Sequence, residues 1–407
     1  MSKHLVVVGA GQAAVQTVHS ARQRGFSGQI TVVGDEPFPP YQRPPLSKKY
    51  LAGTFPTERL FLKADDYYAQ KHVDLLLQLR AVELDLAQRS VRLSDDRRLD
   101  FDFLALATGS RVRRLDVPGA GLAGIHYVRS IADIDAIRAS VHPGARLVIV
   151  GGGYIGLEVA AVARQLELEV TVLEAEPRLL ARVVCPQIAD FYAQYHKQAG
   201  VDIQCGAQVS RFAGDERVTA VVTAGGAQYP CDLAIVGIGV VPNVELAAAA
   251  GLDCDNGILV DTAARTADAA VVAAGDCTNH PHPCAPRRVR LESVNNAVEQ
   301  GKAAAASLLG EAAPFEEVPW FWSDQYDLKL QIAGLAMDYD EVVIRGEIGR
   351  QGFAAYYLAD GRPVAVDAVN SPRDFMHAKK LIAARPKLSA AQIADPATDL
   401  SVYSSSA

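Results

Sequence analysis

Short apolar runs separated by helical patterns organise the first half of the chain. Residues 5–8 (LVVV) and 103–107 (FLALA) are apolar at every position, and residues 30–33 (ITVV) are apolar except at Thr31. Such runs are typical of parallel strands buried on both faces. A helix is predicted over residues 13–24, ending before Gly25. Strands that alternate with helices predict an α/β fold with a parallel sheet.

The same order of elements returns further along. Residues 147–150 (LVIV) predict a strand, 157–164 a helix and 170–173 a second strand. In both copies the first strand runs directly into a glycine-rich turn. The first turn carries Gly9, Gly11, Ala13 and Ala14, and the second carries Gly151, Gly152, Gly153, Tyr154, Ile155 and Gly156. The chain therefore contains the G-x-G-x-x-G/A pattern twice, each time between a strand and a helix.

The spacing of this pattern has a physical basis. Its first glycine permits the tight turn, its second lets the backbone approach a pyrophosphate, and its third small residue lets the helix pack on the strand. The free N–H groups at the helix N-terminus then face the phosphates. Two complete copies predict two dinucleotide sites in one chain.

An acidic residue follows the second strand of each copy. Asp35, with Glu36 as the alternative, and Glu174 can each hydrogen-bond a ribose diol. A carboxylate at residue 174 would repel a 2′-phosphate, so NADH is favoured over NADPH. Arg178 and Arg182 lie nearby and could reach a pyrophosphate or a 2′-phosphate. A solvated strand end is the alternative interpretation of Asp35.

Other apolar strands also end in residues suited to a cofactor. Residues 103–107 lead into Thr108 and Gly109, and 233–236 lead toward Gly239. Residues 271–274 lead into Gly275 and Asp276, before a predicted helix at 294–308. Asp276 could bind a ribityl chain, and a turn or cap residue is the alternative.

A proline-rich segment interrupts the first domain. Pro44 and Pro45 exclude a helix interior or a central strand. We expect Ser47 to cap a short helix with Lys48 in its first turn. A lysine there gains nothing from the helix dipole, so Lys48 is a functional candidate, against the alternative of a rigid surface loop.

The last segment changes character. Both tryptophans lie at Trp320 and Trp322. Strands are expected at 330–333, 341–345, 353–358 and 363–366, the last two joined by a hairpin through Asp360-Gly361, and a helix at 373–384. These elements predict a small α+β domain.

Composition narrows the function. The 407 residues carry a net charge of −7, which argues against general nucleic-acid binding. No apolar run approaches the roughly 18 residues of a membrane span, and the first strand begins too early to follow a signal peptide. We therefore expect a cytoplasmic enzyme without membrane attachment. The six cysteines form no C-x-x-C pair or zinc pattern, so neither a structural disulfide nor a metal site is expected.

In this order, the two glycine motifs, the PPLSK segment, the ATG at 107–109, the GD at 275–276 and the WFWSDQ stretch resemble a known family over essentially the whole chain. The chain is similar to the FAD-dependent ferredoxin reductases of bacterial cytochrome P450 and aromatic-ring dioxygenase systems. The resemblance implies a glutathione-reductase-like α/β fold with FAD on the first motif and NADH on the second. It also implies an FAD domain split in sequence (1–110 and 245–317), an inserted NAD domain (111–244) and a C-terminal α+β domain (318–407).

Motif positions and the resemblance together give the candidate site residues. For FAD they are Gly9, Gly11, Ala13, Ala14, Asp35, Glu36, Arg43, Lys48, Val82, Thr108, Gly109, Arg129, Gly275, Asp276 and Val294. For NAD they are Gly151, Gly152, Gly153, Tyr154, Ile155, Gly156, Glu158, Glu174, Arg182 and Gly239. By resemblance, Lys48 and Glu158 lie near the reactive flavin ring with compensating charges, and Trp322 lies beside the flavin and the acceptor path. These three are the catalytic candidates.

One departure favours this subgroup. Glutathione-reductase-like enzymes carry a redox disulfide just after the first dinucleotide half, and NADH peroxidases a single cysteine. This chain has Gln42 and Arg43 there and no cysteine before Cys185. Electrons therefore cannot leave the flavin through a thiol at that position and must pass to an external acceptor.

The resemblance implies that this acceptor is an acidic [2Fe–2S] ferredoxin. An acidic reductase then needs a local basic patch, and the candidates are Arg287, Arg288, Arg290, Lys302, Lys379 and Lys380; ordinary solvated charges are the alternative. Oligomeric state stays open between monomer and homodimer. Rubredoxin reductases, other NADH:acceptor flavoproteins and apoptosis-inducing-factor-like signalling flavoproteins share both motifs and remain alternatives.

Overall fold

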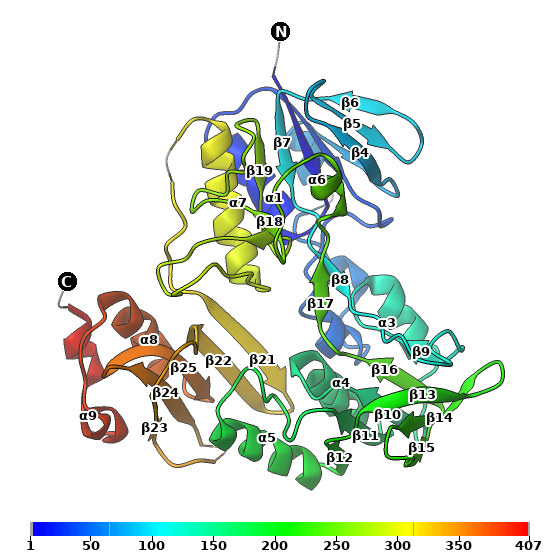
Figure 1. Cartoon of the computed structure of the whole chain (residues 1–407), viewed down its shortest axis with the longest axis vertical. Helices are drawn as coiled ribbons and strands as arrows, with labels where there is room; N and C mark the ends of the chain where they lie inside the picture. Colours follow the sequence, from blue (N-terminus) through cyan, green and yellow to red (C-terminus); the bar gives the residue numbers. More distant parts are fainter. Residues whose placement is uncertain (1–2, 65, 312, 350, 406–407) are drawn as a thin grey trace. The chain divides into compact units, whose positions relative to one another are not determined.

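The computed structural model describes residues 3–64, 66–311, 313–349 and 351–405 (Figure 1). The chain divides into two compact units, each assembled from segments distant in sequence. The first unit contains Met1–Gln42, Glu58–Arg111 and Val241–Pro319, and the second contains Arg43–Thr57, Val112–Val240 and Trp320–Ala407. The short segment around Lys48 thus belongs to the second unit.

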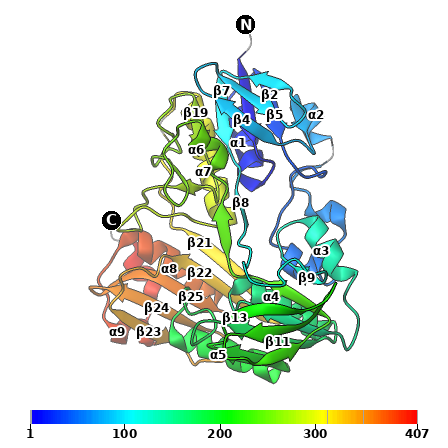
Figure 2. The same ribbon diagram turned by 45° about the vertical axis from the view of Figure 1, so that its right-hand side comes forward.

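The first unit is built on a five-stranded parallel sheet in the order β19-β7-β1-β2-β3. Its strands are β1 (His4–Val8), β2 (Gln29–Val33), β3 (Val73–Leu76), β7 (Phe103–Leu106) and β19 (Val271–Ala273). Residues 5–8 are all buried, as expected of a strand covered on both faces. Helices α1 (Gln12–Gln23) and α7 (Val294–Leu308) pack together on one side of this sheet (Figures 1 and 2).

These two helices approach closely because small residues line their contact. A Cβ added at Gly301 of α7 would lie 2.9 Å from the carbonyl oxygen of Ala13. Four consecutive alanines of α7, residues 303–306, are buried. The flanking antiparallel sheet comprises β4 (Ala81–Asp85), β5 (Ser90–Leu93) and β6 (Arg98–Asp100). The unit also holds η2 (Thr57–Leu60), α2 (Tyr67–Gln70), α6 (Glu245–Ala249), β18 (Ile258–Leu259) and β20 (Thr278–Asn279).

The second unit repeats the parallel architecture. Its sheet has the order β12-β11-β10-β16-β9 and contains β9 (Ile125–His126), β10 (Arg146–Val150), β11 (Glu169–Glu174), β12 (Val201–Cys205) and β16 (Leu233–Val236). The helices are α3 (Ile131–Arg138), α4 (Tyr154–Gln165) and α5 (Pro186–Gln198), and a second sheet is formed by β13 (Val209–Gly214), β14 (Val218–Thr223) and β15 (Gln228–Pro230). Connecting strands are β8 (Ser110–Val112) and β17 (Val240–Pro242).

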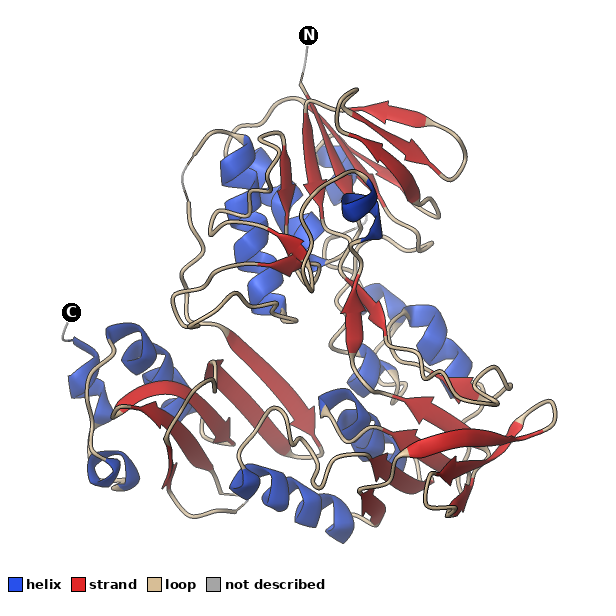
Figure 3. Ribbon diagram, in the orientation of Figure 1, coloured by secondary structure: helices blue, strands red, loops and turns tan. Residues whose placement is uncertain are grey.

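The C-terminal part of the second unit is an antiparallel sheet in the order β21-β22-β25-β24-β23 (Figure 3). Its strands are β21 (Trp320–Gln325), β22 (Leu328–Gly334), β23 (Glu341–Arg345), β24 (Phe353–Ala359) and β25 (Arg362–Val369). Helices α8 (Pro372–Ala384) and α9 (Ala390–Ala394) and the short η3 (Leu400–Ser405) follow. The predicted hairpin is present: Asp360 and Gly361 both have positive φ, as a two-residue hairpin turn requires.

The predicted α/β fold with two Rossmann-like halves and a C-terminal α+β region is confirmed. Within the described residues, no helix is both long enough and apolar enough to cross a membrane. The expectation for Ser47 is wrong. The short helix η1 (Leu46–Tyr50) is preceded by Pro45, and Lys48 breaks its regularity with φ −126° and ψ −111°. The Ser47 hydroxyl instead forms a tertiary hydrogen bond, described below.

Candidate functional site

The first glycine loop (residues 9–14) leaves room for a phosphate. Gly9 has φ +109°, and a Cβ there would lie 2.1 Å from the carbonyl oxygen of Ala107, so only glycine fits. Gly11 is the N-cap of α1 without a side-chain cap, and no atom lies within 4 Å of where its Cβ would be. The first turn of α1 carries no acidic residue. An uncapped helix N-terminus opening onto free space fits a pyrophosphate.

The second glycine loop (residues 151–156) has the same geometry. Gly151 has φ +113° and its Cβ would lie 2.4 Å from the carbonyl oxygen of Gly237. Gly153 is the uncapped N-cap of α4 and opens onto free space. A Cβ at Gly156 would lie 2.1 Å from the carbonyl oxygen of Gly151, so α4 packs tightly against the turn. This loop also fits a dinucleotide pyrophosphate.

The acidic residues of the two loops are held differently. The Glu174 carboxylate accepts hydrogen bonds from the backbone N–H of Gly152 at 2.6 Å and of Glu176 at 2.8 Å. Asp35 is exposed, and Glu36 accepts a hydrogen bond from the Tyr41 hydroxyl at 2.5 Å. Glu174 is thus fixed to its glycine loop by the backbone, whereas Asp35 is exposed.

Polar contacts organise the strand ends of the first unit. Asp276 accepts a hydrogen bond from the Ser110 hydroxyl at 2.8 Å. Thr108 and Asn243 exchange hydrogen bonds, the Thr108 hydroxyl donating to the Asn243 carbonyl at 2.7 Å and the Asn243 side chain donating to the Thr108 carbonyl at 2.8 Å. Gly109, with φ +64°, completes this turn.

A buried glutamine that the sequence analysis missed supports the Gly275-Asp276 turn. The side-chain oxygen of Gln300 accepts hydrogen bonds from the Gly275 N–H and the Thr278 hydroxyl, both at 2.8 Å. Its side-chain nitrogen donates to Nδ1 of His280 at 3.0 Å. Burial lowers the pKa of His280 to about 4, so this ring is neutral near pH 7. Val294, at the start of α7, lies on the same helix as Gln300.

Lys48 and Glu158 form a buried ion pair in the second unit. The Lys48 ammonium lies 2.7 Å from Glu158 Oε2, and the side-chain exposures are 15% and 1%. The Ser47 hydroxyl donates to the same oxygen at 2.5 Å. Two of the catalytic candidates are therefore in direct contact, and each compensates the charge of the other.

Strand β21 presents two different faces. Trp320 and Trp322 lie on one face with ring centroids 5.6 Å apart, and Trp320 also contacts Phe375 of α8 at 6.1 Å. The opposite face carries Phe321 and Ser323, as the alternation of a strand requires. The Ser323 hydroxyl donates to Glu158 Oε1 at 2.7 Å. Trp322 is half-buried, and the other face of its own strand contacts the ion pair.

The remaining candidates are distributed as follows. Arg43 Nη1 donates to the carbonyl of Arg129 at 2.5 Å, so these two flavin candidates are adjacent within the second unit. Tyr154 is packed against Phe321, with centroids 5.0 Å apart. The exposed candidates are Val82, Ile155, Arg182 and Gly239. Arg178 donates to the carbonyls of Ala181 and Val184, so its role is in the loop.

Five of the six thiols have raised pKa values. Burial raises the pKa of Cys185, Cys205, Cys231, Cys254 and Cys277, so these thiols stay protonated near neutral pH. Gln42 donates through its side chain to the carbonyl of Arg59 at 3.0 Å. Across the described segments, no group of His, Cys, Asp and Glu could hold a metal ion.

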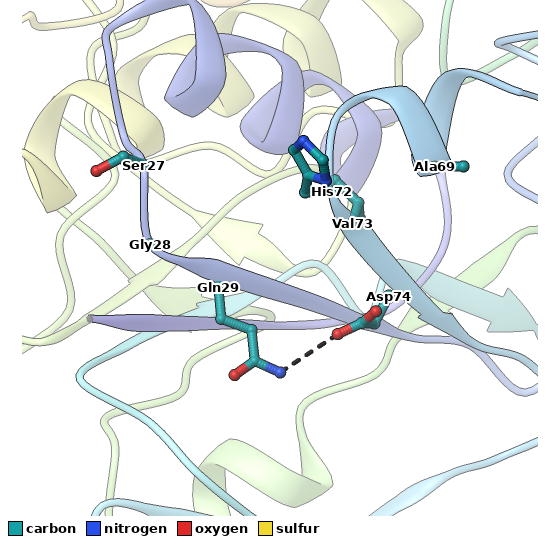
Figure 4. A pocket seen from close by; sticks show the side chains of 7 residues that line it. All are labelled: Ser27, Gly28, Gln29, Ala69, His72, Val73 and Asp74. Atoms are coloured by element: carbon teal, nitrogen blue, oxygen red, sulfur yellow. Dashed lines mark hydrogen bonds between the residues drawn. The ribbon is translucent and has the colours of Figure 1, made fainter. Parts of the chain in front are cut away.

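A surface hollow in the first unit is a different feature. It is lined by Ser27, Gly28, Gln29, Ala69, His72, Val73 and Asp74 (Figure 4). Gln29 and Val73 are the first residues of β2 and β3, so the hollow lies at the amino ends of the strands. Dinucleotides bind at the carboxyl ends, where the first glycine loop lies, so this hollow is not the cofactor site.

Two uncapped glycine loops at the carboxyl ends of two parallel sheets define a flavoprotein of the class that passes electrons between two dinucleotides. Residues 3–301 match the pyridine nucleotide-disulphide oxidoreductase family, and residues 320–403 match the reductase C-terminal family. The chain belongs to the pyridine nucleotide-disulphide oxidoreductase family and is an NAD(P)H-dependent flavoprotein oxidoreductase.

Full-length relatives include ferredoxin reductases. The probable ferredoxin reductase CtmF of Castellaniella defragrans is 44% identical and the match covers 98% of both chains. Putidaredoxin reductase CamA of Pseudomonas putida is 42% identical over 94% of this chain and 92% of the relative. Among solved structures, the reductase in the covalent putidaredoxin reductase–putidaredoxin complex is 41% identical, with a TM-score of 0.95 over 98% of both chains. These matches confirm the resemblance and the cofactors that it implied, FAD and NAD(P)H.

Proposed function

We propose that the chain is an NADH-dependent ferredoxin reductase containing FAD. It would take a hydride from NADH and pass single electrons to a [2Fe–2S] ferredoxin that feeds a cytochrome P450 or a ring-hydroxylating dioxygenase. The observation that carries this proposal is the pair of glycine loops without an accompanying thiol, since the segment after the first loop has Gln42 and Arg43 and no cysteine precedes Cys185.

The residues have separate tasks in this proposal. The first loop, with Asp35 or Glu36, Thr108, Gly109 and Asp276, would bind FAD. The second loop, with Glu174, would bind the adenosine half of NADH. FAD, when bound, supplies hydride acceptance and one-electron release. Lys48 would stabilise negative charge beside the flavin, and Glu158 would shape the nicotinamide site while neutralising Lys48.

No side chain need act as an acid or base in hydride transfer, because that step moves no proton to or from the protein. The chain contributes position and electrostatics. Trp322 is proposed to lie beside the flavin and the path to the acceptor. The domain boundaries given above and a cytoplasmic location are parts of the same proposal.

The ferredoxin docking residues are proposed from charge. Arg287, Arg288 and Lys302 are exposed in the first unit, and Lys380 is exposed in the second. Arg288 donates to the carbonyls of Val260 and Asn279, both at 2.6 Å. Arg290 pairs with Glu292 and is largely buried. Lys379 lies over the Trp320 ring, 5.7 Å from its centroid. Lys302 pairs with Glu299 of the same helix at 2.7 Å, so Lys380 is the most available cation in this set.

A direct assay tests the function. The NADH-reduced holoprotein is mixed anaerobically with purified [2Fe–2S] ferredoxins and, separately, with a rubredoxin. We expect fast reduction of a [2Fe–2S] ferredoxin and slow reduction of the rubredoxin. Faster reduction of the rubredoxin would favour a rubredoxin reductase. Slow transfer to every carrier, with a long-lived charge-transfer complex, would instead indicate a signalling flavoprotein.

A further inference from the structure

A line of buried polar side chains leads away from the Lys48–Glu158 ion pair within the second unit. After donating to Glu158 Oε1, the Ser323 hydroxyl accepts a hydrogen bond from the Gln325 side-chain nitrogen at 3.2 Å. The Gln325 side-chain oxygen accepts from His196 Nε2 at 2.8 Å. Glu158, Ser323, Gln325 and His196 are each at most 1% exposed, so water cannot replace these contacts.

The direction of the hydrogen bonds is set by the groups themselves. Burial lowers the pKa of His196 to about 4, so the ring is neutral and only one of its nitrogens carries a proton. Because Nε2 donates to Gln325, Nδ1 is the acceptor, and the Tyr326 hydroxyl lies 3.3 Å from it. Every donor in the line Tyr326–His196–Gln325–Ser323 therefore points toward the Glu158 carboxylate.

Such a one-way line has an electrostatic consequence. Hydrogen bonds in series polarise one another and strengthen the last bond, which here is the bond to Glu158 Oε1. The other oxygen, Oε2, is held by Lys48 and Ser47. The carboxylate is thus held from both sides, by η1 on one oxygen and by the C-terminal sheet on the other. Removing either set would leave a buried carboxylate short of donors, which is costly.

The alternation of β21 explains why these residues occur together. Phe321, Ser323 and Gln325 lie on one face of the strand, where they contact Tyr154 and Glu158 of α4 and His196 of α5. Trp320 and Trp322 lie on the other face. Figures 1 and 2 both show β21 beside α4. The WFWSDQ stretch therefore combines an aromatic face with a polar face that fastens α4.

We propose that Ser323 and Gln325 are positioning residues that hold the Glu158 carboxylate, and through it the Lys48 ammonium, in one geometry for hydride transfer. The C-terminal domain then sets the electrostatics of the nicotinamide and flavin site through these two side chains of β21. This inference rests on the proposed function only for the identity of the hydride donor, NADH.

The test compares Ser323→Ala and Gln325→Leu with the control Ser210→Ala. Ser210 lies in the same unit, and its substitution removes a hydrogen bond to the carbonyl of Val222 that has no connection to Glu158. We expect Ser323→Ala to lower the rate constant for flavin reduction by NADH about tenfold, with a change in the charge-transfer absorption and in the flavin midpoint potential. Gln325→Leu should have a smaller effect in the same direction, and Ser210→Ala none.

A double-mutant cycle supplies the decisive readout. If Gln325 acts through Ser323, the double variant should be no slower than Ser323→Ala alone. The proposal would be overturned if the effects of the two substitutions on the rate constant multiplied. It would also be overturned if Ser323→Ala and Gln325→Leu had the spectra and rate constants of Ser210→Ala and differed only in a lower Tm. If Ser323→Ala does not retain flavin, the proposal is tested by comparing the rate constants for flavin reduction of Gln325→Leu and Ser210→Ala.

The outcome is separable from that of the proposed function. Flavin reduction by NADH is followed in the holoprotein without any ferredoxin. A wild-type protein that reduces no ferredoxin, while Ser323→Ala slows the hydride step, would refute the ferredoxin assignment and support the positioning role.

Discussion

The two glycine loops share a backbone geometry but differ at two positions that contact one another: the second residue of the loop and the residue that follows the second strand. By hydrogen-bond register, the Gly9 N–H donates to Val33 and the Gly151 N–H to Leu173, so Gly34 occupies the place of Glu174. A Cβ at Gly34 would lie 2.6 Å from Cβ of Ala10. In the second loop Gly152 replaces that alanine, and a Cβ there would lie 2.4 Å from Leu179 Cδ2 and 3.1 Å from Glu174 Oε2. The methyl group and the acid thus exclude one another.

This exchange shows how one fold gives two kinds of dinucleotide site. The second loop fixes its acid by a backbone hydrogen bond from Gly152, so the carboxylate cannot turn away from a phosphate-bearing ribose. In the first loop, the acid follows one residue later at Asp35, which is exposed. We therefore expect the second site to discriminate against a dinucleotide with a 2′-phosphate. The first site needs only to bind its dinucleotide.

The two units also place a glutamine and a neutral histidine behind each site, with opposite polarity. In the first unit, Gln300 accepts from the Gly275 turn and donates to His280. In the second, Gln325 donates toward Glu158 through Ser323 and accepts from His196. In the first unit, the glutamine therefore accepts from the backbone N–H of Gly275. In the second unit, the glutamine belongs to a series of donors that ends at the Glu158 carboxylate.

The largest expected effect concerns the third small residue of each loop. Gly156→Ala would force Cβ to within 2.1 Å of the Gly151 carbonyl, displacing α4 and Glu158 with it. Misplacement on this scale should lower the rate constant for flavin reduction by NADH on the order of a hundredfold, measured by stopped flow. The matched change Ala14→Gly should leave that rate constant near wild type and cost about 1 kcal/mol of unfolding free energy. Equal kinetic losses in both variants would remove the distinction between the loops.

The next prediction concerns the pH dependence of stability that arises from the buried His280. The unfolded chain binds a proton at histidine near pH 6.5, whereas burial lowers the pKa of His280 to about 4 in the folded state. Stability should therefore fall as the pH drops from about 6.5 to about 4, by at most about 3 kcal/mol from this residue. In His280→Asn this slope of the unfolding free energy against pH should decrease, and in the exposed control His142→Asn it should not. An unchanged slope in His280→Asn would contradict the assignment of His280 as a buried neutral ring.

The preference for NADH over NADPH should change on substitution of Glu174 and not on substitution of Asp35. The wild-type KM for NADH should lie well below that for NADPH, because the fixed Glu174 carboxylate repels a 2′-phosphate. Glu174→Gln removes the charge and should narrow the ratio of kcat/KM values about tenfold. The counterpart Asp35→Asn should leave the ratio unchanged. Equal kinetics with both coenzymes in the wild type would refute this interpretation of Glu174.

The smallest expected effect is on ferredoxin docking, and its measurement compares the contributions of the two units. Lys302→Glu in the first unit and Lys380→Glu in the second each reverse one positive charge. The control is the same reversal at Lys71, an exposed residue at the C-terminal end of α2 in the first unit. We expect kcat/KM for ferredoxin to fall a few-fold in either docking variant and on raising the salt concentration, through weakened steering. Ferredoxin reduction indifferent to both salt and Lys302→Glu would exclude this patch.

Local patterns predicted most of the fold. β16 and α7 have the predicted bounds, because apolar runs and glycine turns are read within a few residues. Residues 186–198 were not predicted as a helix, and the polar residues behind the sites were also missed. Gln300, Ser323 and His196 have hydrogen-bond partners 25, 165 and 129 residues away in the chain, so the spacing within one element does not reveal these partners.

The failure at Ser47 has the same origin. A serine before a short helix can cap it or bond a distant partner, and here the partner is Glu158, 111 residues away. Likewise, the one-residue offset between Asp35 and Glu174 is visible only once the backbone hydrogen bonds of each sheet are known. Sequence reasoning identified the Lys48–Glu158 pair by resemblance, but the structure alone shows which groups hold it.

The discontinuous first unit sets an order of events during synthesis. Its sheet needs β19 at residues 271–273 to pair with β7 at residues 103–106, and α7 to cover α1. At a translation rate of about 5–20 residues per second, β7 waits about 10–30 s for its second neighbour. Meanwhile the intervening segment can complete its own parallel sheet as soon as β16 emerges. The nascent chain would therefore complete the parallel sheet that carries the proposed NADH site first, and the sheet that carries the proposed FAD site only afterwards.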